Sequence, residues 1–193
     1  MLIQKNPAPA EPANLNTSKM DSYVLFLRAV NVGGNNLVKM SDVCKSFADS
    51  GFKNVSSYIQ TGNIIFESSL KEEKMLEISK KIMKKLAGKD IEVFLRKSSE
   101  LKEIAASGFF KSVKSKDAKL YVSFISKDLG IKFPFRSKNG DVEILGMKNG
   151  AAFCVSYPYK GKYGFPNGFI ESNFGVLATT RNWNVIQKIS EKL

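Results

Sequence analysis

The first half of the chain shows a pattern of hydrophobic and polar positions that predicts four strands and two helices. Continuous or alternating apolar residues indicate the strands, and apolar residues three and four positions apart indicate the helices. We expect strands at 23–32, 55–60, 63–68 and 91–96, and helices at 39–51 and 69–89. This βαββαβ order over residues 22 to about 97 is typical of a ferredoxin-like fold.

Side-chain alternation along these strands separates two faces of the expected sheet. One face is wholly apolar and suits the packing of both helices; its members are Leu25, Leu27, Ala29, Val55, Ile59, Ile64, Phe66, Ile91, Val93 and Leu95. The other face is mixed and contains Phe26, Arg28, Val30, Tyr58, Gln60, Ile65, Glu67, Phe94 and Arg96. Because the mixed face is too apolar to stand fully in water, we expect the rest of the chain to cover part of it.

The second half of the chain predicts further helices and strands, and therefore a second, smaller α+β subdomain. A hairpin is expected around Asn149-Gly150, a pair that suits a type I′ turn. With Lys148 opposite Ala151, the side chains of Val142 and Ile144 would share a face with those of Val155 and Tyr157. The last helix carries an apolar stripe of Trp183, Ile186, Ile189 and Leu193.

These patterns divide the chain into three parts. Residues 1–19 are rich in Pro, Ala and Asn without periodicity, so we expect a disordered extension. Residues 20–97 would form the ferredoxin-like α+β subdomain, and residues 98–193 the C-terminal α+β subdomain that ends in a helix. The fold class is therefore α+β, with the two subdomains packed against each other.

Composition narrows the classes of function. The 193 residues carry 30 basic and 18 acidic side chains, a net charge of +12 that favours anionic partners, although many lysines lie on one helix where they would serve solubility. Histidine is absent, which excludes histidine bases and histidine-containing zinc sites, and we expect no metal and no cofactor. The sequence contains no apolar run of membrane-spanning length and no secretory signal, so we expect a cytoplasmic protein without membrane contact.

Two polar motifs should meet at one edge of the first sheet. In a ferredoxin-like unit the first strand ends beside the turn between the second and third strands, where the first helix also begins. This places the segment 31–36, with Asn31, Gly33, Gly34 and Asn35, next to Gln60-Thr61-Gly62-Asn63. Helix amides and close-packed glycine backbone favour anions, but Gly-Gly-Asn-Asn is also an ordinary turn sequence.

A third polar motif, ATTRNWN at residues 178–184, surrounds the single tryptophan. If the last helix begins there, Thr179 or Thr180 is a suitable N-cap, and Arg181 lies in the first turn. The helix dipole disfavours arginine at that position, so we expect Arg181 to have a partner, either a carboxylate such as Glu171 or a bound anion. The alternative is purely structural, with Trp183 filling the subdomain interface and Arg181 in an internal ion pair.

Three stretches, LRAVNVGGNNLVKM, YIQTGNIIF and LATTRNWN, resemble in order and spacing the signatures of a bacterial family, domain of unknown function 1697. The resemblance extends over nearly everything after Met20. Ala29 departs from it, because the family usually has glycine there, and YGFPNGFIE at 163–171 replaces a more basic segment. The family implies no established activity, so the resemblance supports the fold and leaves the function open.

Three functions remain in competition. We favour binding of a small ligand that bears phosphate or carboxylate, in a cleft between the subdomains. The expected lining is Arg28, Asn31, Gly33, Gly34, Asn35, Gln60, Asn63, Thr180, Arg181 and Asn182, with Trp183 as a hydrophobic wall. The alternatives are single-stranded nucleic-acid binding by the aromatic and basic loop 157–163, and an enzyme of unknown reaction that works without histidine. Oligomeric state stays open.

Overall fold

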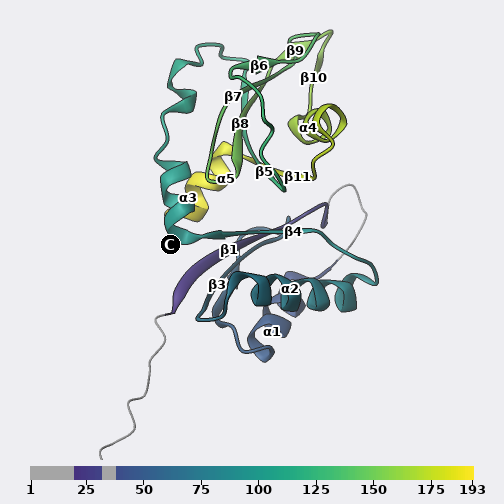
Figure 1. Ribbon diagram of the computed structural model, residues 1–193, viewed down its shortest axis with the longest axis vertical. Helices are drawn as coiled ribbons and strands as arrows, with labels where there is room; N and C mark the ends of the chain where they lie inside the picture. The colour runs from purple at the N-terminus through teal and green to yellow at the C-terminus, as the bar shows by residue number, and fades with distance from the viewer. Residues whose placement is uncertain (1–19, 32–37) are drawn as a thin grey trace, which may run out of the picture.

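The computed structural model describes residues 20–31 and 38–193, which form two main sheets flanked by helices (Figure 1). The first sheet has the strand order β2-β3-β1-β4, and all its neighbouring strands are antiparallel. Its elements are β1 (Asp21–Leu27), α1 (Met40–Asp49), β2 (Lys53–Ser57), β3 (Asn63–Ser68), α2 (Glu72–Ala87) and β4 (Val93–Lys97). They follow one another in the order that the sequence pattern predicts. The predicted extension 1–19 lies outside the described residues.

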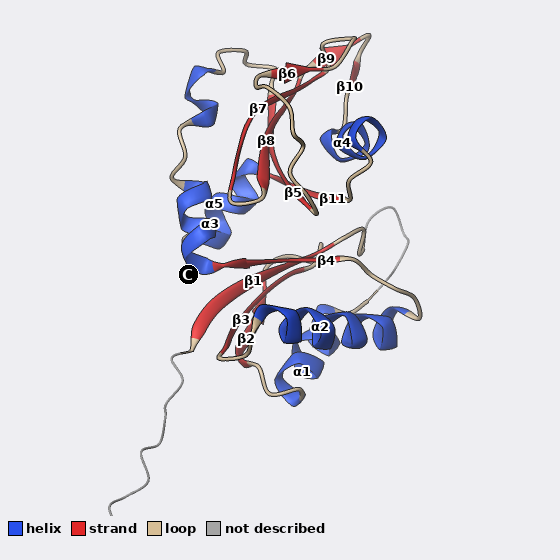
Figure 2. Cartoon of the chain, in the orientation of Figure 1, coloured by secondary structure: helices blue, strands red, loops and turns tan. Residues whose placement is uncertain are grey.

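Helices α1 and α2 cover the face of the first sheet that points away from the second sheet (Figure 2). Leu25 and Phe66 from the strands meet Phe47 from α1 and Met75 from α2 in one fully buried cluster. This cluster contains most of the apolar face that alternation predicts. Two members of that face are placed wrongly, because Ala29 and Ile59 are exposed.

Strand β1 ends at Leu27, earlier than the apolar run 23–32 predicts. Ala29 and Asn31 have φ angles of 54° and 56°, and Ile59 has 53°, so the backbone is left-handed at all three. A left-handed residue breaks strand alternation, and for alanine and isoleucine it is disfavoured. The positive φ of Ala29 also gives a physical reason why a glycine would suit this position.

The second sheet has five strands in the order β11-β5-β8-β7-β6, one strand more than the first, so the second half is not the smaller part. A short hairpin of β9 and β10 extends from it. The elements are α3 (Ser98–Ala105), η1 (Phe109–Ser112), β5 (Lys119–Ile125), β6 (Phe135–Arg136), β7 (Val142–Lys148), β8 (Ala151–Ser156), β9 (Pro158–Tyr159), β10 (Lys162–Tyr163), α4 (Pro166–Phe174), β11 (Ala178–Asn182) and α5 (Trp183–Ser190).

The β7-β8 hairpin turns at Asn149-Gly150, and Lys148 pairs with Ala151 as expected. A bulge between Ile144 and Gly146 then shifts the register, so Ile144 lies opposite Cys154 rather than Val155. One extra residue moves the following side chains to the other face. The predicted common face of Ile144 and Val155 is therefore wrong: they belong to different hydrophobic clusters.

The last helix begins later than the sequence suggests. Residues 178–182 form strand β11, which pairs antiparallel with β5, and α5 starts only at Trp183. Thr179 and Thr180 are therefore not helix caps, and Arg181 is not in a helical first turn. The pairing with β5 joins segments more than fifty residues apart, which local sequence cannot reveal.

The mixed face of the first sheet is covered, as predicted, by the second half of the chain. Phe26 of β1 stacks on Phe124 of β5 with ring centroids 3.9 Å apart. Ile186 and Ile189 of α5 are fully buried in the same cluster, and Trp183 and Leu193 are partly buried against it. The stripe on the last helix thus faces the interface between the sheets. No helix within the described residues is long and apolar enough to cross a membrane.

Candidate functional site

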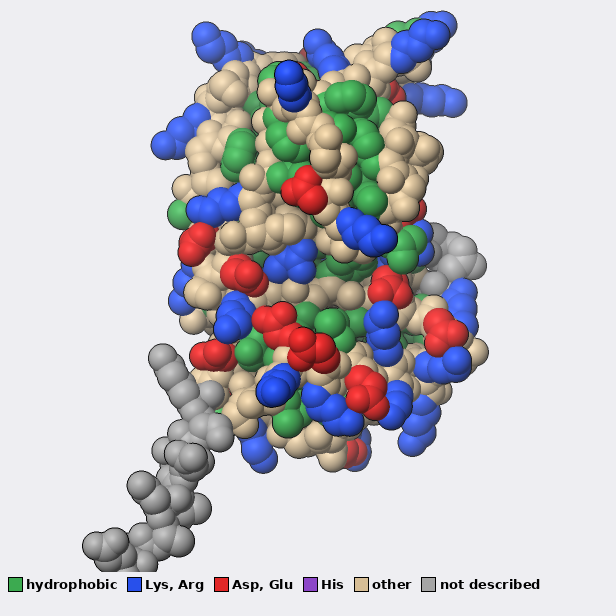
Figure 3. Space-filling view, in the orientation of Figure 1, with side chains coloured by type: hydrophobic (Ala, Val, Ile, Leu, Met, Phe, Trp, Pro, Cys, Tyr) green, Lys and Arg blue, Asp and Glu red, His purple; other side chains and the backbone are tan. Residues whose placement is uncertain are grey.

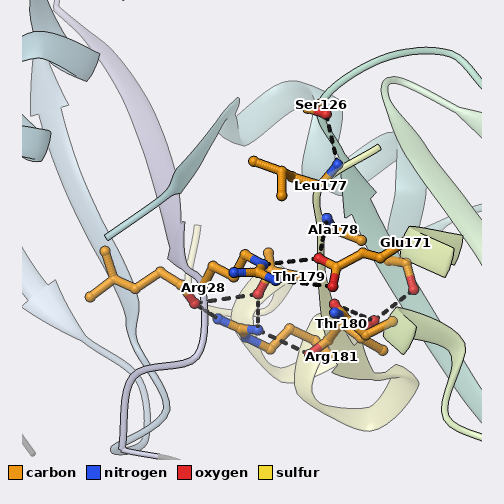
Figure 4. Close-up of polar contacts among 11 residues, drawn as sticks. Arg28, Ser126, Glu171, Leu177, Ala178, Thr179, Thr180 and Arg181 are labelled. Atoms are coloured by element: carbon orange, nitrogen blue, oxygen red, sulfur yellow. Dashed lines mark hydrogen bonds and ion pairs between the residues drawn. The ribbon is translucent and has the colours of Figure 1, made fainter. Parts of the chain in front are cut away.

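Arg181 lies at the junction of the two sheets, with 8% of its surface exposed (Figure 4). Its Nε donates to Oδ1 of Asn63 at 2.6 Å, and its Nη2 donates to the carbonyl oxygen of Leu27 at 2.9 Å. Longer bonds from Nη2 reach the carbonyl oxygens of Thr61 and Gly62, at 3.1 and 3.2 Å. One guanidinium therefore joins β11 to the end of β1 and to the β2-β3 turn.

The partners of Arg181 are neutral oxygens. Nη1 completes the set by donating to Oγ1 of Thr179 at 2.8 Å and to the carbonyl oxygen of Thr180 at 2.9 Å. Burial lowers the pKa of Arg181 to about 10, so the group stays charged at neutral pH. Among the described residues no carboxylate hydrogen bonds to it or forms an ion pair with it. The expected pair of Arg181 with Glu171 is therefore wrong.

Glu171 of α4 pairs instead with Arg28, which directly follows β1 (Figure 4). The pair is bidentate: Nε donates to Oε1 and Nη2 to Oε2, each at 2.9 Å. Oε1 also accepts the backbone N–H of Ala178 at 3.0 Å. Burial alone would raise the pKa of Glu171, but the bonds from Arg28 and Ala178 outweigh it and the pKa is lowered. Arg28 keeps 34% of its side chain exposed.

Asn31 and Gln60 meet at the same end of the first sheet. The side-chain amide of Asn31 donates to the carbonyl oxygens of Val38 and Gln60, both at 2.8 Å, and its Oδ1 accepts the N–H of Val38 at 2.8 Å. With Lys39 they line a recess of about 390 Å³. Asn31 thus fixes the backbone on both sides of this recess.

The remaining predicted site residues divide into three groups. Asn63 is buried and supports Arg181, while its amide donates to the carbonyl oxygen of Tyr58 at 2.9 Å. Thr180 shares a 2.8 Å hydrogen bond with Ser123 on β5, and Asn182 is exposed beside a different recess. Gly33, Gly34 and Asn35 lie outside the described residues. Arg28, Asn63 and Arg181 are therefore grouped around the end of β1, and Asn182 is not part of that group.

Trp183 is not a wall of this group. Its ring meets Phe110 and Phe153 edge to face, with centroids 5.1 and 6.4 Å apart. These rings belong to the core between the sheets. Trp183 therefore packs at the edge of this core, and its ring contacts are with η1 and β8 of the second half of the chain.

A larger recess, of about 580 Å³, lies elsewhere between the two sheets, where β4 faces the β7-β8 turn. Arg96 reaches across it and donates to the carbonyl oxygens of Asn149 and Gly150, at 2.8 and 2.7 Å. The lining holds three basic and three acidic side chains: Arg96, Lys127, Lys148, Glu72, Glu100 and Asp128. Both signs of charge also appear along the seam between the upper and lower parts of Figure 3. This balance gives no preference for an anion.

Sequence reasoning missed this recess, although alternation placed Arg96 on the mixed face. The contact with the β7-β8 turn depends on tertiary packing, for which the sequence carries no local signal. Within the described residues no group of three acidic or cysteine side chains could hold a metal ion. Cys154 is buried, and burial raises the pKa of its thiol to about 12, which leaves it protonated and unreactive at neutral pH.

The fold and the junction define an α+β protein built on two antiparallel-paired sheets, with a charged seam between them. A family model described as "Protein of unknown function (DUF1697)" matches residues 20–133. The chain belongs to this family, as the sequence suggests; the matched region contains the first two of the three stretches and ends before LATTRNWN.

Comparison with solved structures identifies the same fold in a conserved bacterial protein, SP0830, from Streptococcus pneumoniae. That protein is 19% identical in sequence, with a TM-score of 0.66, and the match covers 90% of this chain and 98% of that chain. No curated protein matches this chain.

Proposed function

We propose that the protein binds a small ligand bearing phosphate or carboxylate at the seam between its two sheets, through Arg28. The proposal assumes the two-part organisation expected above, a ferredoxin-like subdomain at 20–97 and an α+β subdomain at 98–193. The strand order β2-β3-β1-β4 with two helices on one face supports the first part. The second sheet, formed entirely after residue 97, supports the second.

The observation that carries the proposal is a local surplus of positive charge where the seam meets the end of β1. Arg28 and Arg181 both contact groups around the end of β1, but Glu171 is the only described carboxylate that bonds to either. At a separation of about 8 Å and an effective dielectric constant of about 20, one such uncompensated charge would attract an anion by about 2 kcal/mol. The charge of Arg181 thus favours an anion at the exposed edge of the seam.

Arg28 is the group that could contact this ligand directly. Glu171 occupies its Nε and Nη2, and within the described residues no hydrogen bond uses Nη1. The arginine fork binds carboxylate and phosphate in the same bidentate way that it binds Glu171. A ligand could therefore add to the pair through Nη1 or replace Glu171. Gln60 and Asn31, at the same end of the sheet, would supply the polar surroundings.

Arg181 would act at a distance, since all three of its nitrogens already donate to protein oxygens. The expected direct contact of an anion with Arg181 is replaced in this proposal by electrostatic support. An enzymatic reaction would need a general base or a nucleophile. The carboxylate of Glu171 is already bound by Arg28 and its pKa is lowered, which makes it a weaker base. The arrangement therefore favours binding over catalysis.

Thermal unfolding with added pyrophosphate or citrate tests the proposal, with sodium chloride at equal ionic strength as the reference. We expect pyrophosphate or citrate to raise the melting temperature of the native protein more than chloride does. Glu171→Gln removes the competing charge yet keeps an oxygen for the Ala178 N–H, so it should increase the anion-induced shift. The double variant Arg28→Met, Glu171→Gln leaves no unpaired carboxylate and should lose the shift. An equal shift in all three proteins would contradict the proposal.

A further inference from the structure

Strands β9 and β10 form a hairpin at the end of the second sheet farthest from the first sheet (Figure 1). Aromatic rings and lysines gather around this hairpin. Tyr159, Tyr163 and Phe165 are 40%, 38% and 59% exposed there. Lys119, at the start of β5, places its Nζ 3.6 Å from the ring centroid of Tyr163. We call this surface the hairpin end; it consists of Lys119, Tyr121, Tyr159, Lys160, Lys162, Tyr163 and Phe165.

A recess of about 320 Å³ continues this surface toward α5. Lys119 and Tyr121 line it on one side, and Asn182 and Trp183 on the other. Tyr121 also meets Phe165 edge to face, with ring centroids 6.1 Å apart. Lys119 and Tyr121 therefore belong to both the hairpin end and the recess, and the two form one continuous surface.

The lysines of this region are not neutralised. Segments 111–121 and 157–165 together contain six lysines and one acidic residue: Lys111, Lys114, Lys116, Lys119, Lys160, Lys162 and Asp117. Asp141 also lies beside Gly164, but it accepts a hydrogen bond from Ser137. Within the described part of the chain none of the six lysines forms an ion pair, whereas four of the five α2 lysines do: Lys74, Lys80, Lys81 and Lys84, but not Lys85.

We propose that the hairpin end binds single-stranded nucleic acid. Unpaired bases would stack on Tyr159, Tyr163 and Phe165, and the lysines would contact the phosphates. Exposed rings distinguish this surface from one that only attracts acidic protein segments, because a polypeptide of acidic residues has no aromatic rings to stack on them. A duplex, whose bases already stack on each other, would use the lysines alone.

The position of this surface differs from that in RNA-recognition domains, which use the open face of a four-stranded sheet. In this protein the corresponding face holds Val24, Phe26 and Phe94, and all three are buried against the second half of the chain. Tyr157, which the sequence grouped with the hairpin, is also engaged elsewhere: its hydroxyl donates to Glu143 at 3.1 Å. The hairpin end is the aromatic and basic surface that packing leaves open.

The test is fluorescence anisotropy of the full chain with labelled 12-nucleotide single strands of thymidine and of uridine, and a DNA duplex of equal length. We expect both single strands to bind at least tenfold more tightly than the duplex. Tyr159→Ala and Tyr163→Ala should each weaken single-strand binding by at least fivefold, in line with the loss of one stacked base. Binding should also quench the fluorescence of Trp183, the only tryptophan, which lines the recess.

Matched charge variants distinguish binding at the hairpin end from a general effect of the protein's net positive charge. Lys160→Gln with Lys162→Gln should weaken binding and make the slope of log affinity against log salt shallower by about 1.4. Lys81→Gln with Lys84→Gln removes the same charge from α2 and should change affinity less than twofold. The double variant Arg28→Met, Glu171→Gln should change affinity less than twofold, which keeps this surface separate from the proposed anion seam. Equal loss in both lysine pairs, equal binding of duplex, or equal binding of polyglutamate would overturn the proposal.

Discussion

Arg181 contributes to the fold as a buried connector, because its guanidinium holds oxygens from three separate segments of the chain. Arg181→Met would leave Oδ1 of Asn63 without its donor, and it would remove one of two donors from the carbonyl oxygens of Leu27 and Gly62. One buried acceptor that loses its partner costs about 1–3 kcal/mol, and the weakened carbonyls add to this, so we expect a loss of at least about 2 kcal/mol in the free energy of unfolding. Urea unfolding followed by circular dichroism measures it.

Arg136 offers the matched control for that measurement. It is exposed, and its guanidinium lies 5.0 Å from the ring centroid of Tyr157. Arg136→Met should cost less than about 1 kcal/mol, the range of an exposed cation–π contact. If the two variants unfold at the same urea concentration, Arg181 is not the connector described above.

Ala29 is the residue where a substitution should relieve strain. At φ 54° an alanine is disfavoured by about 1–2 kcal/mol, while glycine would pay about 0.5–1 kcal/mol in extra chain entropy. We therefore expect Ala29→Gly to raise the free energy of unfolding by up to about 1 kcal/mol. A decrease of more than about 1 kcal/mol in the same urea experiment would show that the left-handed turn is not strained.

At the scale of elements, the β2-β3 turn is fixed by one glycine. Gly62 has φ 78°, and a Cβ there would lie 2.7 Å from Cβ of Leu27. Its carbonyl oxygen accepts both the N–H of Leu27 at 2.8 Å and Nη2 of Arg181. Gly62→Ala should cost about 2 kcal/mol or more, because the turn must move away from β1.

Thermal unfolding of Gly62→Ala beside Gly51→Ala checks this effect. Gly51 also has a positive φ, 98°, but a Cβ there meets no atom within 4 Å. Both variants carry the backbone strain, and only Gly62→Ala adds the clash. Equal melting temperatures would contradict a close contact between the turn and β1.

The elements also show which parts of the fold the sequence predicts. Helical spacing places α1 and α2 correctly, because their apolar stripes are local features of the chain. The sequence predicts the start of a helix where β11 lies, because the pairing of β11 with β5 depends on residues more than fifty positions away. The bulge at Ile144 was likewise invisible, although a glycine at 146 gives room to the ring of Phe109.

The sequence predicts the candidate site only in part, because some of its contacts follow from strand order and others from long-range packing. Topology correctly brings Asn31 next to Gln60 and the end of β1 next to the β2-β3 turn, since these contacts follow from strand order. The pairing of Arg28 with Glu171 could not be derived, because the two residues are 143 positions apart. Arg28 follows a strand of the first sheet, whereas Glu171 lies in α4 beside the second sheet. The contacts of Arg181 could not be predicted either, because the carbonyl oxygens of the first sheet that accept from it are more than one hundred positions away.

At the scale of the whole molecule, the Arg28–Glu171 pair links the two halves and should make their association depend on pH. The pKa of Glu171 is lowered in the folded protein, so its contribution to stability is present above the ordinary carboxyl pKa and is lost as pH falls through the lowered value. The stability difference between the native protein and Glu171→Gln should therefore shrink as the pH is lowered from neutral to well below the ordinary carboxyl pKa. A difference that stays constant over that interval would contradict a role for this ion pair in stability.

Arginine side-chain NMR tests the central claim, anion binding through Arg28, most directly. The chain has four arginines, Arg28, Arg96, Arg136 and Arg181, so their Nε–H signals can be assigned from single variants. On titration with pyrophosphate at constant ionic strength, we expect the Arg28 signal to move in a saturable way while that of exposed Arg136 stays in place. An unmoved Arg28 signal, or equal and unsaturable shifts of Arg28 and Arg136, would contradict anion binding at the seam.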